Sequence, residues 1–353
     1  MHDDLWRMTY SERRAPVAAP APHASTTLKE SHWTPKRHGL ITALCEETVA
    51  RTPAIRSLAH YSNGILDFAV LRADRAPLSS LITENGDDAH NESLPGSRLL
   101  LCAQDLGAVL RPLKTGELMR TVLAGGRAGL WGGRARPDEF LAAVTDVPGG
   151  VPEMDEAMNR LTARIRTEVH GLPDELLGGD AQAKAHLQTG EAPAGPQVDF
   201  GTAAAPDTVY EQRLRDLWRT HVNTTDLQYA GYYRDWTLVC VGDVFDSQEL
   251  GPRFMDVSVR TRRTAYRDLS RSLRGHLVRL KDALDLIAPP PGGGASIDRL
   301  VLDVQEGALY VHWLTPRAFL VGVTLDQRQV ANAERRLAGL AQAAGGVEVP
   351  TPR

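Results

Sequence analysis

The chain has 353 residues, of which 42% are hydrophobic and 24% charged, a balance typical of globular proteins. Its length allows two domains of ordinary size, each able to bury a core. A formal net charge of −4 argues against a protein that binds nucleic acid with its whole surface. No apolar run reaches the roughly 18 residues that cross a bilayer, so we expect no membrane span.

Cysteine usage and the N-terminus bear on the compartment. Cys45, Cys102 and Cys240 form no CxxC pair, so the sequence predicts neither a disulfide framework nor a zinc site built from cysteines. The N-terminus lacks the basic start and apolar core of a secretion signal, and we therefore expect a cytoplasmic protein. Of the 40 basic residues 35 are Arg, which is typical of a high-GC bacterial genome and weakens any functional reading of Arg richness.

The first part of the chain begins with a segment that lacks apolar periodicity. Residues 1–36 combine a Pro/Ala-rich run with a polar stretch, and we expect a disordered tail there. Helical spacing predicts a helix near 40–48, and two strand-like runs follow it. A polar loop is expected at 83–94. The first module, residues 37–170, closes with a helix that carries apolar residues on one face over 151–165.

A glycine-rich run lies inside the first module. Gly125–Gly133 lacks the Gly-Lys-Ser/Thr of a phosphate-binding loop, and we interpret it as a structural turn. Gly132 and Gly133, inside a strand, indicate a bulge or the close approach of another backbone. Residues 171–206, with several Gly and Pro residues, then predict a linker between domains.

The second module, residues 207–346, opens with a capping-box pattern formed by Thr208 and Glu211. Its clearest element is a helix with a stripe of apolar residues from Leu269 to Ile287, which a Pro-rich run ends. A final helix is expected from Val330 to Leu340. The strands predicted in the two modules are 58–61, 65–71, 229–233, 237–245, 300–304, 308–313 and 319–324.

The two modules are similar in sequence. With a shift of 179 residues, 120–145 lies over 299–324 with nine identities in 26 positions. With a shift of 172, 52–74 lies over 224–246 with four more identities in the same order. We therefore interpret the chain as a tandem duplication of one α-β-β-α-β-β-β-α unit.

This unit resembles the Roadblock/LC7 family of profilin-like α/β modules, most closely over Asp298–Leu340. The resemblance implies a five-stranded antiparallel sheet in each module. Family members usually pair through their sheets and second helices, and they act as scaffolds and as regulators of small GTPases without chemistry of their own. One chain would then supply both halves of such a dimer. Whole chains forming a homodimer is a further alternative.

Partner-binding candidates lie on the second module. Residues 260–281 carry eight basic side chains and a single acid, Asp268, so the face opposite the apolar stripe is either solvated or bound to an acidic surface. A tyrosine-rich hairpin nearby could supply aromatic anchors. The predicted partner-binding residues are Arg260, Arg263, Arg267, Arg271, Arg274, Tyr229, Tyr232, Tyr233 and Trp236.

Ligand candidates are fewer. Asp243 and Asp246 end an apolar run, where capping of a turn is the simpler interpretation, and Arg120 and Arg299 occupy equivalent positions of the repeat. If a pocket lies between the modules, these four residues are the predicted ligand-binding candidates. No Ser-His-Asp or Cys-His arrangement is evident, and no histidines are spaced as HxH or HxxxH. The sequence therefore predicts no catalytic residues, metal or cofactor.

Three functions follow as alternatives. The first is a regulatory or scaffold protein that binds a protein partner, such as a small GTPase. The second is an enzyme or small-ligand protein with a pocket between the modules. The third is a nucleic-acid-associated regulator that uses the Arg-rich helix, and we rank it last because the chain is acidic overall.

Overall fold

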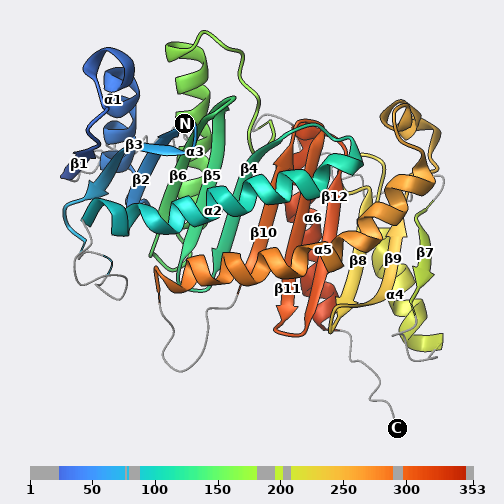
Figure 1. Ribbon diagram of the computed structural model, residues 1–353. Coiled ribbons are helices and arrows are strands. Elements are labelled where there is room, and N and C mark those ends of the chain that lie inside the picture. Colours follow the sequence, from blue (N-terminus) through green and yellow to red (C-terminus); the bar gives the residue numbers. More distant parts are fainter. Residues whose placement is uncertain are drawn as a thin grey trace, which may run out of the picture.

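The computed structural model describes residues 24–75, 78, 88–180, 195–201, 208–288 and 297–346. Within these residues, twelve strands form one continuous antiparallel sheet, and helices cover both of its faces (Figure 1). The prediction of a mixed α/β fold is confirmed. The sequence predicts a five-stranded sheet in each module, whereas in the structure each half of the chain contributes six strands to one shared sheet.

The N-terminal half (24–180) contains β1 (Ser25–Lys29), α1 (Pro35–Arg51), β2 (Ser57–Ser62), β3 (Ile65–Arg72), α2 (Asp88–Leu110), η1 (Arg111–Leu113), β4 (Leu118–Gly125), β5 (Gly129–Arg136), β6 (Glu139–Thr145), α3 (Val151–Arg164) and η2 (Ile165–Val169). The C-terminal half (195–346) contains β7 (Gln197–Phe200), α4 (Thr208–His221), β8 (Tyr229–Arg234), β9 (Thr237–Asp243), η3 (Gln248–Phe254), α5 (Val259–Asp285), β10 (Ile297–Val304), β11 (Gly307–Thr315), β12 (Ala318–Thr324), η4 (Gln327–Gln329) and α6 (Val330–Gly345).

The two halves have the same strand order. From the outer edge inward, the N-terminal half runs β1-β3-β2-β6-β5-β4 and the C-terminal half runs β7-β9-β8-β12-β11-β10. They join at β4 and β10, the innermost strand of each half, which pair antiparallel with Val122 opposite Val301. Because these two valines are also equivalent positions of the repeat, the halves are related by a pseudo-two-fold axis that passes between them.

The helices form one layer on each face of the sheet. On one face α2 and α5 lie side by side across the middle of the molecule, and α2 packs on β4, β5 and β6 (Figure 1). On the other face α1 packs on β3, α3 on β5 and β6, and α6 on β11 and β12, with α4 beside α6. One main cluster of buried side chains runs through both halves and includes Trp131 and Trp218.

The apolar stripe predicted in α5 is buried as expected, with Leu273, Leu280 and Leu284 fully covered. Ser258 caps the start of the helix, because its hydroxyl oxygen accepts a hydrogen bond of 3.1 Å from the backbone N–H of Thr261. Although α5 has 27 residues, neither it nor any other described helix is apolar enough to cross a membrane.

Both outer strands lie where the sequence predicts no regular structure. β1 belongs to the expected disordered tail and β7 to the expected linker, so both expectations are wrong for these residues. Each strand is short and pairs through its backbone with the free edge of a longer strand, β1 with β3 and β7 with β9. Backbone pairing of this kind requires no apolar alternation, which explains why the pattern gave no signal. Residues 1–23, 181–194 and 202–207 lie outside the described residues.

The polar loop expected at 83–94 is also wrong in part, because α2 begins at Asp88. Three polar residues of its first turns, Asn91, Glu92 and Ser93, are buried. Glu92 forms a salt bridge of 2.8 Å with Arg56, and both side chains are buried. Polar residues therefore occupy core positions here, which removes the apolar periodicity of a helix. Residues 83–87 lie outside the described part of the chain.

The glycine-rich run is the hairpin between β4 and β5, as predicted. Gly133 lies against the Trp131 ring, and a Cβ atom at position 133 would sit only 2.2 Å from that ring. Gly126, in the turn itself, has no atom closer than 3.7 Å to such a Cβ. The glycine at 133 thus makes room for the buried Trp131.

Candidate functional site

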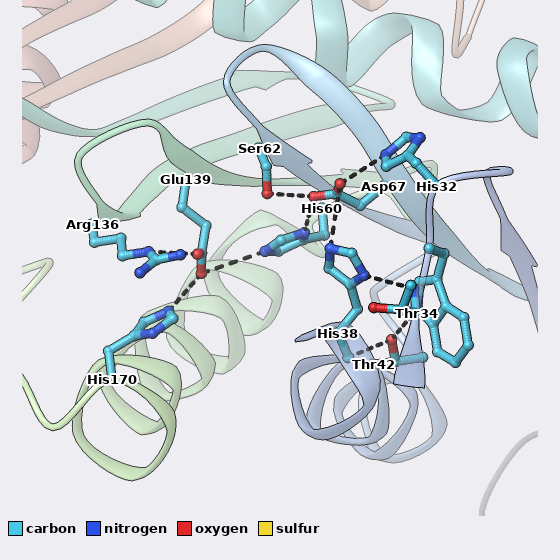
Figure 2. Close-up of polar contacts among 11 residues, drawn as sticks. His32, Thr34, His38, Thr42, His60, Ser62, Asp67, Arg136, Glu139 and His170 are labelled. Atoms are coloured by element: carbon cyan, nitrogen blue, oxygen red, sulfur yellow. Dashed lines mark hydrogen bonds and ion pairs between the residues drawn. The ribbon is translucent and has the colours of Figure 1, made fainter. Parts of the chain in front are cut away.

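The most concentrated group of buried titratable side chains is a network of histidines and carboxylates in the N-terminal half, shown in Figure 2. Asp67, on β3, stands at its centre. Its Oδ2 atom lies 2.8 Å from His60 Nδ1 and accepts a hydrogen bond of 2.6 Å from the Ser62 hydroxyl. Its Oδ1 atom lies 2.9 Å from His32 Nε2 and 3.6 Å from His38 Nε2. One carboxylate therefore contacts three imidazole rings.

A second carboxylate, Glu139 at the start of β6, continues the network. Its Oε1 atom lies 3.4 Å from His60 Nε2 and 2.7 Å from His170 Nε2, and its Oε2 atom accepts a hydrogen bond of 2.8 Å from Arg136 Nε. His60 thus bridges the two carboxylates through its two ring nitrogens, and Figure 2 shows its ring between them.

The local sequence holds His38 in place from several sides. Its Nδ1 atom accepts a hydrogen bond of 3.1 Å from the backbone N–H of Thr34, just before α1 begins. Its carbonyl oxygen accepts from the Thr42 hydroxyl, one turn further along the helix. The Trp33 ring stacks on the imidazole with centroids 6.3 Å apart. These contacts fix the start of α1 against the sheet.

Burial and pairing act in opposite directions on the pKa values of the network. Burial alone would lower the pKa of His60, but the hydrogen bonds and charges of Asp67 and Glu139 outweigh it and raise that pKa above its usual value. Burial alone would raise the pKa of both carboxylates, but the histidines hold the pKa of Glu139 at about 2 and that of Asp67 well below its ordinary value. At His38 burial prevails over Asp67 and lowers the pKa.

The network is closed in its middle and open at its ends. His60, Asp67 and Glu139 are buried, whereas the side chains of His32 and Arg136 are 43% and 45% exposed. Among the described residues, no three His, Cys, Asp or Glu side chains are placed to hold a metal ion. Chemically, the arrangement can take up and release protons while it ties α1 and the end of η2 to the sheet.

Within the described residues, the C-terminal half has no such network at the equivalent positions. His60 pairs with Leu141 in the sheet as Tyr232 pairs with Leu320, so Tyr232 stands in the place of His60. By the same correspondence, Val239 replaces Asp67 and Ala318 replaces Glu139. Sequence reasoning missed this site because its histidines lie far apart along the chain, and only the fold brings them together.

The structure separates the predicted ligand residues into two places. Asp243 and Asp246 both pair with Arg263 of α5, at 2.6 Å and 2.8 Å. Asp243 also accepts a hydrogen bond of 3.1 Å from the backbone N–H of Phe245, which agrees with the capping role. Arg120 and Arg299 instead lie together at the junction of the halves.

That junction holds a groove of about 700 Å³ between α3 and α6, with Arg120, Arg299 and His312 in its lining. Two equivalent ion pairs flank the pseudo-two-fold axis. Arg120 Nη1 lies 2.6 Å from Asp155, and Arg299 pairs with Glu334, which is Asp155's equivalent 179 residues later. Arg120 and Arg299 thus line the groove between the halves, whereas Asp243 and Asp246 do not belong to it.

The two ion pairs differ in depth. Arg120 is buried and has a second acidic neighbour, Asp303, whose Oδ2 atom lies 2.8 Å from its Nε. Asp303 is fully buried and also accepts a hydrogen bond of 2.9 Å from the backbone N–H of Gly178. Gly178 has φ +80°, and a Cβ there would lie 2.9 Å from Arg120 Nη1, so this position requires glycine. The start of the expected linker therefore packs on the central ion pair.

The predicted partner-binding residues fall into exposed and buried sets. Arg260 and Arg274 are exposed, and the Arg271 side chain is 83% exposed. Arg263 and Arg267 are engaged in internal ion pairs, Arg267 with Asp199 at 2.6 Å.

The tyrosine hairpin is not a surface anchor. Tyr229, Tyr232 and Tyr233 are buried, and Trp236 is half-buried against Phe319. That expectation is wrong because helices cover both faces of the sheet, so alternation along β8 does not leave one face in solvent.

The three cysteines are free and buried. Burial raises the pKa of Cys102 to about 11 and raises that of Cys45 and Cys240 further, so none is an activated thiolate. Comparison of the chain with protein-family models and with curated proteins found no match.

Proposed function

We propose that this protein is a non-enzymatic regulator or scaffold that binds a protein partner, with two Roadblock-like modules in tandem from a duplication. The observation that carries the proposal is how the halves join, through the pairing of β4 with β10 and the packing of α2 beside α5. Sheets and second helices are the elements through which members of the resembled family usually pair. One chain would thus provide the whole dimeric platform.

The paired helices also provide the partner surface that we propose. Leu101 on α2 and Val278 on α5 are 63% and 58% exposed, so each of the paired helices presents an apolar side chain to a partner. Arg260, Arg271 and Arg274 stand exposed on α5. Apolar contacts with arginines around them are typical of interface hot spots and favour an acidic partner surface.

A small GTPase is the first partner to test, in keeping with the resemblance and with a cytoplasmic setting. The probe is the set of purified small GTPases encoded by the same genome, loaded with GDP or a GTP analogue, with binding followed by biolayer interferometry. We expect one of them to bind. The double variant Arg260→Glu/Arg271→Glu should weaken that binding at least tenfold, because it places two acids against an acidic surface.

The matched control reverses two exposed arginines on the opposite face of the sheet, Arg213→Glu/Arg219→Glu on α4. It changes the net charge equally and should leave binding within twofold of the native protein. If no GTPase binds, the GTPase assignment fails. If both double variants weaken binding equally, the effect is one of overall charge and the α5 surface is excluded.

The groove at the junction of the halves favours a second candidate, a small-ligand protein. Its volume of about 700 Å³ falls in the range of ligand pockets, and it lies where the halves meet. A metabolite panel screened by thermal shift tests this candidate. Stabilisation by one compound class that Arg299→Ala abolishes would support it, and uniformly flat melting temperatures would count against it.

A further inference from the structure

A pocket of about 190 Å³ opens beside α2, above the ends of β4 and β5. The helix supplies Leu100, Ala103 and Gly107, which recur at helical spacing and form one stripe, while the sheet supplies Gly132 and Phe140. The residues through which α2 contacts α5 belong to another side of the helix, since Cys102 approaches His276 and Asp105 pairs with Arg279. The pocket thus lies on a side of α2 that does not contact α5.

The C-terminal half fills the corresponding place with its own side chains. Phe319 is the equivalent of Phe140. Across the strands, Phe319 pairs with Trp313, whereas Phe140 pairs with Arg134, the equivalent of Trp313. The Trp313 ring lies 5.9 Å from the Phe319 ring, and the Trp236 ring lies 4.9 Å from it.

At the described equivalent positions of the N-terminal half, no aromatic side chain covers Phe140. Gly132 stands where the C-terminal half has Val311, and Gly64 stands where it has Trp236. Phe140 is consequently left half-buried at the pocket wall. The unfilled space is of the kind that one large aromatic side chain occupies in the other half.

Charge at the rim indicates what accompanies that side chain. Arg111 is exposed at the rim and forms no ion pair with a described residue. The Arg134 side chain is only 14% exposed, and its nearest acid, Glu175, is 3.9 Å away. Glu117 is the one acidic residue among the described lining residues. The balance of charge around the opening is therefore positive.

We propose that this pocket receives one aromatic side chain from an acidic segment of a partner protein, with a carboxylate of that segment beside Arg111. An aromatic anchor in a preformed pocket, surrounded by a polar rim, is the usual centre of a protein interface. The inference rests on the proposed function, because it names how the partner is held. The pocket lies beside α2, whereas the exposed arginines lie on α5.

The test uses the full chain and a phage-displayed library of random peptides. Selected peptides should share an aromatic residue next to Asp or Glu. Gly107→Leu should raise their dissociation constant at least tenfold by filling the pocket. A Cβ at position 107 meets only Leu118, at 3.7 Å, so the helix tolerates the change. Gln104→Trp, at the exposed rim, is a second blocking variant should the first fail to fold.

The matched control is Gly39→Leu on α1, where a new Cβ meets nothing within 4 Å. It makes the same change in another helix and should leave peptide binding within twofold. Peptides without a shared aromatic residue, or peptides that bind Gly107→Leu and Gln104→Trp as tightly as the native chain, would overturn the inference. If Arg260→Glu/Arg271→Glu alone abolishes binding, the pocket is excluded while the proposed α5 surface stands.

Discussion

Val122 and Val301 pair with each other at the centre of the sheet, and they are equivalent positions of the two halves. The strand register around them is symmetric, with Arg120 opposite Asp303 and Ala124 opposite Arg299. Such a register is what two copies of one module produce when they pair through the same edge. The predictions below begin from this junction.

The halves should remain together when the chain between them is cut. A protease site inserted within 181–194, outside the described residues, separates the peptide chain but leaves the β4–β10 pairing and the α2–α5 packing intact. We expect both fragments to co-elute from a size-exclusion column at the position of the uncut protein. Separate elution of two folded fragments would contradict the strength that we assign to this junction.

Equivalent arginines should differ greatly in their effect on stability. Arg120→Ala leaves the buried Asp303 without its cationic partner, and we expect a loss of about 3–5 kcal/mol in the free energy of unfolding. Arg299→Ala breaks a partly exposed pair with Glu334 and should cost less than about 1 kcal/mol. Urea denaturation measures both.

A double variant supplies the control for Arg120. Asp303→Asn removes the stranded charge, so Arg120→Ala/Asp303→Asn should be more stable than Arg120→Ala alone. A double variant that is less stable than the single one would show that the loss comes from packing of the arginine and not from the buried carboxylate.

The histidine network should make stability depend on pH in a defined direction. The folded-state pKa of His60 is raised, so its contribution is present below the unfolded pKa of about 6.5 and is lost as pH rises through the folded value. The pKa values of Asp67 and Glu139 are lowered, so their contributions to stability are present above the unfolded pKa values near 4. These contributions are lost as pH falls through the folded pKa, which is about 2 for Glu139. Together, His60, Asp67 and Glu139 therefore stabilise the fold most between about pH 5 and 6.5.

Ring NMR of the individual histidines measures this directly. His60 should titrate above the usual histidine value and His38 below it, because carboxylate contacts dominate at the first and burial at the second. In His60→Gln, the excess stability at pH 6 over pH 8 should shrink. Identical midpoints for the two rings would be incompatible with the network as described.

Two glycines of the same run should respond differently to alanine. Gly133→Ala brings a methyl group into the Trp131 ring and should cost about 1–3 kcal/mol of unfolding free energy. Gly126→Ala meets only an ordinary contact at 3.7 Å and should stay within about 0.5 kcal/mol of the native protein. Thermal or urea denaturation distinguishes them, and equal losses would refute the packing role of Gly133.

The sequence predicted elements whose own side chains carry a periodic pattern. The leucine stripe of α5 is an example, since a helix with one buried face must repeat apolar residues every three or four positions. α2 was missed at its start because Glu92 is buried in a salt bridge with Arg56, so a core position looks polar in the sequence. The edge strands were missed because they have only five and four residues, too few to show a periodic pattern.

The sites depended on information that spacing does not contain. Arg120 and Arg299 were identified because a repeat marks equivalent positions, and the junction brings both into one groove. The histidine network joins residues from His32 to His170, which no local motif connects. The tyrosines of β8 were assigned to the surface because alternation cannot tell whether a second layer of helices lies on the other face.

Because both halves belong to one polypeptide, each half can change its residues independently of the other. In an assembly of two identical subunits, every substitution appears twice, and any docking feature is offered in duplicate. Here the position equivalent to His60 holds Tyr232, and the position equivalent to Gly132 holds Val311. A molecule that lands on this scaffold meets a surface with a single orientation, and the expected stoichiometry is one bound molecule per chain.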